Sequence, residues 1–165
     1  MRIKDNFLDK EEFDKLSSTI MGENFPWYYS DIITSKNDTN DKLYFVHHLY
    51  KQSGVHMVHG LIASDWCNLF SKFLKKLNYK SLIRIKANLY IGTKKKVIHE
   101  AHKDFPYKHK GCILYMNDNN GETFFEKEKV KPKANRAIFF DPSVAHSSSS
   151  CTDQKRRVNI NFNYF

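Results

Sequence analysis

The sequence predicts a mainly β domain, a double-sheet jelly roll with N-terminal helices packed on the outer face of one sheet. Two amphipathic segments with helical spacing lie within residues 1–80. After them, the spacing of apolar residues changes from about 3.6 to 2, the period of a β-strand. Short strand-like segments separated by turn residues then follow one another, a pattern typical of sandwiches and barrels.

The composition fits a folded domain without a disulfide framework. With 165 residues, 41% hydrophobic and 15% aromatic, the chain is long enough to bury a core and too apolar to be disordered. We expect one domain over 1–165, with 1–80 as a helical and strand support and 81–165 as the jelly-roll core. The three cysteines lack C-x-x-C spacing, and we expect no signal peptide and no membrane-spanning segment. These features favour a cytoplasmic location.

Two helices are expected in the support region. The first begins after Asp9, a candidate N-cap, and Glu12 would complete a capping box. The second follows Ser64 and covers about 65–77. Its apolar residues recur at helical spacing, which favours a core-facing stripe over a ligand pocket: Trp66, Leu69, Phe70, Phe73, Leu74 and Leu77.

Short strands account for most of the remaining chain. Two are expected before the second helix, at 25–29 and 43–50, with a polar loop at 30–42 between them. The others are expected at 83–91, 112–117, 122–125, 136–140 and 158–165, with a hairpin turn at 118–121.

The C-terminal strand places a charged residue inside the barrel. Alternation puts Arg157 on the same face as Asn159 and Asn161, and leaves the apolar face for the helices. Strand parity therefore selects Arg157 rather than Arg156 as the interior arginine. Burying it is costly without a carboxylate partner. An internal Asp or Glu could supply that partner, but a bound dicarboxylate explains the pattern better.

The motif His102-Lys-Asp104 can hold two adjacent positions on one metal ion, because residues two apart on extended backbone point to the same side. His146 is the candidate third ligand. Two histidines and one carboxylate form the facial triad of non-haem Fe(II) oxygenases. Asp141 is the nearby rival carboxylate. The segment from His99 to His102 is one residue short of H-E-x-x-H, which excludes that zinc protease motif.

An ordered set of motifs resembles the catalytic domain of Fe(II)/2-oxoglutarate oxygenases, in the prolyl 4-hydroxylase branch that includes small phage-encoded and bacterial members. The resemblance runs from about Arg84 to the end of the sequence and implies a double-stranded β-helix, the jelly roll of that family. Where the family often has Gly-Gly, this chain has Asn120-Gly121. The motifs are His102-Lys-Asp104, Cys112-Ile-Leu-Tyr-Met-Asn117, Gly121-Glu-Thr123, Val130-Lys-Pro-Lys133, Arg136-Ala-Ile-Phe-Phe-Asp141, His146 and Arg157-Val-Asn-Ile-Asn-Phe162.

The resemblance implies roles for individual residues. The catalytic metal ligands for Fe(II) would be His102, Asp104 and His146. Arg157 would grip the distal carboxylate of 2-oxoglutarate and Tyr115 would hydrogen-bond it. Two further residues, Tyr90 and Thr123, would line the co-substrate pocket.

The family implies a dioxygenase that hydroxylates a C–H bond and releases succinate and CO2, with ascorbate as a further candidate cofactor. A protein or peptide substrate, as for prolyl hydroxylases, is the first expectation. The formal charge of +9 and the lysines at 94–96 keep nucleic acid open as an alternative substrate. A non-catalytic binding module on the same barrel is the remaining alternative. The other histidines are expected to be surface or substrate-side groups rather than metal ligands: His47, His48, His56, His59 and His109.

Overall fold

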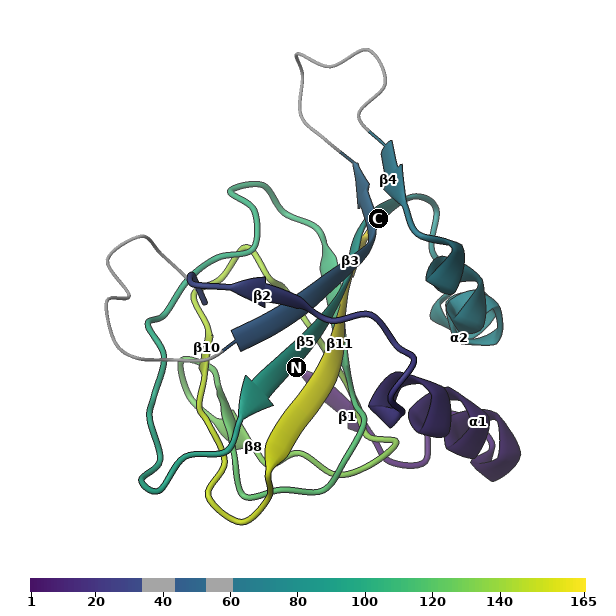
Figure 1. Cartoon of the computed structure of the whole chain (residues 1–165). Coiled ribbons are helices and arrows are strands. Elements are labelled where there is room, and N and C mark those ends of the chain that lie inside the picture. Colours follow the sequence, from purple (N-terminus) through teal and green to yellow (C-terminus); the bar gives the residue numbers. More distant parts are fainter. Residues whose placement is uncertain (34–43, 53–60) are drawn as a thin grey trace.

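A computed structural model describes residues 1–33, 44–52 and 61–165 of the chain. These residues form a mostly β structure with two antiparallel sheets and few helices, which confirms the predicted class (Figure 1). Most of the expected loop at 30–42 and two of the histidines, His56 and His59, lie outside the described residues. No helix within the described ranges is both long and apolar enough to cross a membrane.

The larger sheet has eight strands. Its order is β1-β9-β6-β11-β5-β3-β2, with β4 paired to β3. The two longest neighbours, β5 and β11, pair antiparallel along their full length and form the middle of the sheet. The strands are β1 (Arg2–Lys4), β2 (Tyr28–Ser30), β3 (Tyr44–Gln52), β4 (Leu61–Ala63), β5 (Leu82–Ile91), β6 (Lys110–Tyr115), β9 (Ala137–Phe140) and β11 (Arg156–Tyr164).

The smaller sheet has three strands in the order β10 (Ser147–Ser148), β7 (Thr123–Phe124) and β8 (Lys129–Val130). The segment 118–121 does not close a hairpin, so that expectation is wrong: it carries the chain from β6 in the larger sheet to β7 in the smaller one. Polar side chains bend it, because Asp118 Oδ1 accepts from Ala134 N (2.6 Å) and Asn119 Oδ1 accepts from Gly121 N (3.0 Å). The hairpin is instead formed by β7 and β8.

The main core lies against the apolar face of β11, whose alternation is as predicted. Val158, Ile160 and Phe162 are fully buried there. They share one apolar cluster with buried residues of α1 (Lys10–Met21) and α2 (Ser71–Leu77). Phe73 of α2 stacks on Phe162 with ring centroids 4.2 Å apart, and Figure 1 shows both helices on the same side of the sheet.

The helices differ in detail from expectation. The second begins as a 3-10 helix, η1 (Asp65–Phe70), before α2 continues it, and the Ser64 side chain accepts from Trp66 N as a cap should. Asp9 stands at the N-cap of α1 without a side-chain capping bond. The expected capping box does not form, because Glu12 pairs with Lys72 at 2.8 Å and Asp9 with Lys76 at 3.4 Å. These acids link the two helices instead.

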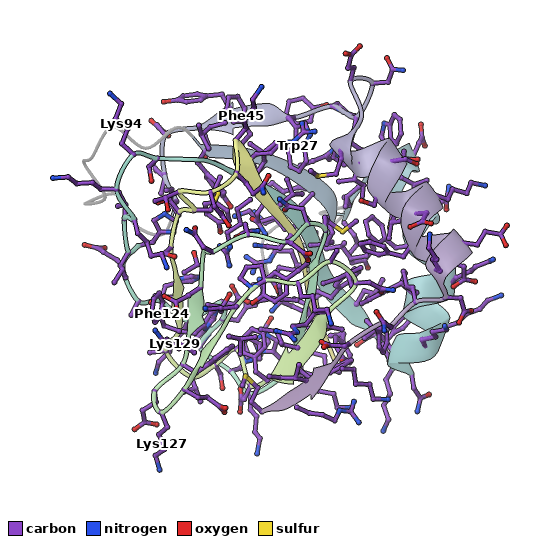
Figure 2. All side chains as sticks on the ribbon, turned by 90° about the horizontal axis from the view of Figure 1, so that it is seen from below. Trp27, Phe45, Lys94, Phe124, Lys127 and Lys129 are labelled. Atoms are coloured by element: carbon purple, nitrogen blue, oxygen red, sulfur yellow. The ribbon has the colours of Figure 1, made fainter. Side chains whose placement is uncertain are left out.

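Side chains fill the space between the helices and the sheet, whereas Lys94 and Lys127 point outward (Figure 2). Lys94, Lys127 and Lys129 are exposed at the surface. Some of the basic side chains are therefore solvated, whereas others, such as Arg157, are buried inside the fold.

Candidate metal centre

Two extended segments bring the predicted metal ligands together. His102 and His146 form an isolated antiparallel bridge: His102 N donates to His146 O (2.9 Å) and His146 N donates to His102 O (3.0 Å). With Asp104 two residues further on, each side chain offers a ligand atom, and these atoms all lie within 4.8 Å of one another. The backbone pairing therefore preforms a cluster of two imidazoles and one carboxylate.

Asp104 is held as a buried anion by three neighbours. Its side chain is 3% exposed, and Arg84 Nη2 donates to Oδ1 at 2.6 Å. Asn161 and Asn163 each donate from Nδ2 to Oδ2, at 3.1 and 2.9 Å. Burial alone would raise the pKa of Asp104, but the Arg84 charge and the hydrogen bonds to the carboxylate hold it well below its usual range. The charged form is the one that binds a metal.

The two histidines are suited to the same role. His146 Nδ1 donates to Val144 O (3.0 Å), which leaves Nε2 available. Burial lowers the pKa of His146, which favours the neutral ring that a metal ion binds. His102 keeps a buried Nδ1 that has no hydrogen-bond partner among the described residues. The donor set thus fits a divalent transition metal.

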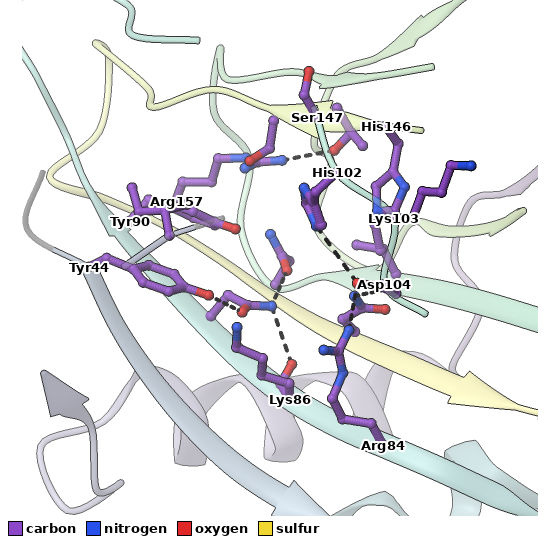
Figure 3. A pocket seen from close by; sticks show the side chains of 17 residues that line it. Tyr44, Arg84, Lys86, Tyr90, His102, Lys103, Asp104, His146, Ser147 and Arg157 are labelled. Carbon is purple, nitrogen blue, oxygen red and sulfur yellow. Dashed lines mark hydrogen bonds and ion pairs between the residues drawn. The ribbon is translucent and has the colours of Figure 1, made fainter. Parts of the chain in front are cut away.

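The metal ligands line a cavity of about 220 Å³ that also contains the interior arginine (Figure 3). β5 and β11 form one wall, and their register sets the polar side chains in opposed pairs: Tyr90 with Arg157, Asn88 with Asn159, Lys86 with Asn161 and Arg84 with Asn163. The first pair lies at one end of this row and the last pair contacts Asp104 at the other.

Arg157 has no exposed surface and no carboxylate partner in the part of the chain that the structure describes. Its Nη1 donates to Ser149 O (3.2 Å), its Nη2 donates to Thr123 Oγ1 (2.9 Å), and its Nε has no partner there. No Asp or Glu among these residues therefore acts as the internal carboxylate partner of Arg157 that the sequence left open. A buried guanidinium with a spare donor is suited to bind an anionic ligand.

The other residues expected near Arg157 surround it. The guanidinium lies over the Tyr90 ring at 5.2 Å and 5.8 Å from the Tyr115 ring centroid. The Tyr115 and Thr123 hydroxyls are 2.6 Å apart. A Cβ at Gly121 would come within 2.7 Å of Arg157 Cδ, so only glycine leaves the arginine its place. Three residues from β5, β6 and β7 thus surround Arg157 of β11.

Several cavity residues were not anticipated. Tyr44 stacks on Tyr90 with ring centroids 4.9 Å apart, and its hydroxyl is hydrogen-bonded to Asn88 Oδ1. Arg84 was also missed as the partner of Asp104. The available signal was that strand 83–91 carries a polar face too rich in charge and amide groups to be plain surface. That pattern does not predict that this strand pairs with β11.

The remaining sequence candidates do not belong to the metal-ligand cluster. Asp141 Oδ1 accepts from the Ser143 backbone and hydroxyl, so it belongs to a turn. His47 is buried, with Nδ1 donating to Pro26 O and Nε2 near the Ser64 hydroxyl. His109 is buried beside Asn163, and burial lowers the pKa of His48 to about 4. Arg156 donates to Met21 O of α1 (2.6 Å), on the opposite face from Arg157.

Comparison with known proteins supports the fold. No family model and no curated protein matches the sequence. Among solved structures, a prolyl hydroxylase of Trichoplax adhaerens, in complex with a hypoxia inducible factor peptide fragment, is 13% identical with a TM-score of 0.67, covering 99% of this chain and 82% of that one. A 2OG-Fe(II) oxygenase family oxidoreductase from Burkholderia pseudomallei is 9% identical with a TM-score of 0.64, covering 98% and 82%.

A viral collagen prolyl hydroxylase from Paramecium Bursaria Chlorella virus-1, in its 2OG complex, is 16% identical with a TM-score of 0.59, covering 98% of this chain and 93% of that one. At these identities the similarity shows a shared fold, and the mostly β architecture is consistent with the jelly roll of these proteins. The expected resemblance to 2-oxoglutarate oxygenases is therefore confirmed at the level of the fold.

Proposed function

We propose that this protein is an Fe(II)- and 2-oxoglutarate-dependent dioxygenase that hydroxylates a C–H bond. The observation that carries the proposal is the joint presence, in one small cavity, of a His-Asp-His cluster and a buried arginine without a carboxylate partner among the described residues. The first can hold a metal, and the second can hold the far end of a dicarboxylate. The similar solved structures include enzymes of this type.

His102, Asp104 and His146 would hold Fe(II). When bound, the iron and 2-oxoglutarate supply the oxidation: one oxygen atom of O2 enters the substrate C–H bond, the other enters succinate, and CO2 is released. Arg157 would bind the distal carboxylate, and the proximity of the Tyr115 and Thr123 hydroxyls supports a shared role in holding it. Tyr90 walls this end of the cavity and shields the guanidinium from water.

The substrate is proposed to be a protein or peptide, with prolyl hydroxylation as the first reaction to test. The Trichoplax neighbour was solved with a peptide fragment, which supports this choice. Nucleic acid is the second candidate, because Lys94, Lys95 and Lys96 form an exposed basic turn after β5. We further propose that residues 1–165 act as one domain in the cytoplasm, with ascorbate able to keep the iron reduced.

Succinate formation tests the proposal. The purified protein, with Fe(II), ascorbate, O2 and 2-oxoglutarate, should release succinate, faster in the presence of a substrate, and chelation of the iron should stop it. Proline-containing peptides and methylated oligonucleotides are compared in the same assay. An enzyme that binds 2-oxoglutarate yet makes no succinate with any of them would be a non-catalytic module, and the dioxygenase assignment would fail.

A further inference from the structure

Two lysines line the cavity without contributing to the metal-ligand cluster: Lys103, which is exposed, and Lys86, which is half-buried. Lys86 lies on β5, two residues from Arg84, and its side chain enters the cavity (Figure 3). It is half-buried, and no carboxylate lies within ion-pair distance of it in the described part of the chain. Its nearest recorded partner is the Tyr44 ring, with Nζ 5.3 Å from the ring centroid. A lysine in such a place normally has an anionic or solvent partner.

The charges around Lys86 leave it uncompensated. Asp104 is the one acidic side chain among the described lining residues, and it is already engaged by Arg84, Asn161 and Asn163. Fe(II) and 2-oxoglutarate together add no net charge, so loading the site does not supply the missing anion. Burial, followed by the charge of Arg84, lowers the pKa of Lys86 to about 8, so an anion beside its ammonium group would stabilise the charged form.

The position of Lys86 separates it from the end that holds Arg157. In the strand pairing, Lys86 is opposite Asn161, which itself donates to Asp104, whereas Arg157 is opposite Tyr90. Figure 3 shows Lys86 and Arg84 on the same strand, away from Arg157. Lys86 is therefore on the metal-facing part of the cavity, where the reacting group of a substrate must come.

We propose that Lys86 is a specificity-determining residue that binds a carboxylate of the substrate beside the C–H bond to be oxidised. The inference rests on the proposed dioxygenase function. It commits to an acidic side chain of a peptide, because the cavity is small and Lys86 lies inside it, where a compact carboxylate fits and the backbone of an oligonucleotide does not. A free small carboxylic acid shares this chemistry and forms a separate arm of the test.

The test uses matched pairs of short peptides in the succinate assay. Each pair carries a central proline or a central acidic residue, and its members differ only by Glu against Gln, or Asp against Asn, at or next to the centre. N-acetylglutamate and N-acetylglutamine form the small-molecule arm. The wild-type enzyme should prefer the acidic member of a peptide pair by roughly ten- to hundredfold, the range of a hydrogen bond to a charged group.

Lys86→Met should remove that preference, and Lys86→Glu should shift it toward peptides that carry lysine instead. Lys51→Met is the matched control, because Lys51 lies near Lys86 on the neighbouring strand β3 but does not line the cavity. It should keep the preference. The mass of the product, increased by one oxygen atom, identifies which residue reacts.

Four results would overturn the inference. Two concern the peptide pairs: equal turnover of the acidic and neutral members, or an acidic preference that survives Lys86→Met. The third is turnover of the free acid or of oligonucleotides but not of acidic peptides. The fourth is a loss of 2-oxoglutarate affinity in Lys86→Met as large as in Arg157→Ala. Failure of the wild-type protein to bind metal and 2-oxoglutarate at all would instead contradict the proposed function on which the inference depends.

Discussion

Replacing Arg157 by alanine should remove most of the affinity for 2-oxoglutarate. The guanidinium is fully buried, and among the described residues it is satisfied only by Ser149 O and Thr123 Oγ1. A bound distal carboxylate would complete a buried charged pair, and removing one partner of such a pair costs about 3–5 kcal/mol. Since about 1.4 kcal/mol is tenfold in binding, Arg157→Ala should raise the Kd by roughly a hundredfold or more.

Ligand-induced stabilisation gives a direct assay. At a 2-oxoglutarate concentration of roughly 100 times the wild-type Kd, binding stabilises the fold by about 2.7 kcal/mol, whereas a variant with hundredfold weaker binding gains only about 0.4 kcal/mol. Thermal unfolding of metal-loaded protein should show this difference. Arg157→Lys, which retains the charge without the planar fork, should fall between the two.

Arg156→Ala is the matched control, because this neighbour points to the other face and donates to Met21 O. It should change the Kd by only a few fold, through surface charge. Equal losses in the Arg156 and Arg157 variants, or a larger loss at Arg156, would refute the assignment of the interior arginine.

Three further predictions address the pocket, the core and the pH response. Gly121→Ala should weaken the binding of 2-oxoglutarate while Arg157 is still present, because the new Cβ would lie 2.7 Å from Arg157 Cδ and displace that side chain. An unchanged Kd in a titration would contradict this prediction. Phe73→Ala, which loses the stack on Phe162, should lower the free energy of unfolding by about 3–5 kcal/mol in urea, and a loss below 1 kcal/mol would contradict the packing. The hydrogen bond from Arg136 lowers the pKa of Asp5 to about 2. Asp5→Asn should therefore reduce the free energy of unfolding, by about 1 kcal/mol or less because the pair is so exposed. This difference from wild type should be complete above pH 3.8 and disappear as the pH falls through about 2. A difference that persists at lower pH would rule out this pair as its source.

The features that sequence reasoning predicted best are those with strict periodicity. Alternation along β11 placed Arg157 inside and Val158 in the core, because a one-residue slip would expose the whole apolar face. The spacing of His102 and Asp104 likewise follows from extended backbone, although their encounter with His146 depends on two backbone hydrogen bonds between distant segments.

Features that depend on pairing between distant segments could not be predicted. The strand β1 is only three residues long and exists because it pairs with β9, more than 130 residues later. The turn at 118–121 has hairpin residues, yet Asp118 binds the backbone of Ala134 and the chain crosses to the second sheet. The contact of Arg84 with Asp104 similarly requires knowledge of which strands are neighbours.

Anaerobic titration of Fe(II) and 2-oxoglutarate tests the central claim most directly, because chelation of Fe(II) by a 2-oxo acid produces a visible charge-transfer absorption. The wild-type protein and Asp141→Ala, which removes the rival carboxylate of the turn, should both develop this absorption with one iron per chain. Asp104→Ala should not, provided that circular dichroism shows a folded protein despite the uncompensated Arg84. Absorption that persists in Asp104→Ala, or that disappears in Asp141→Ala, would contradict the assignment of His102, Asp104 and His146 as the metal ligands.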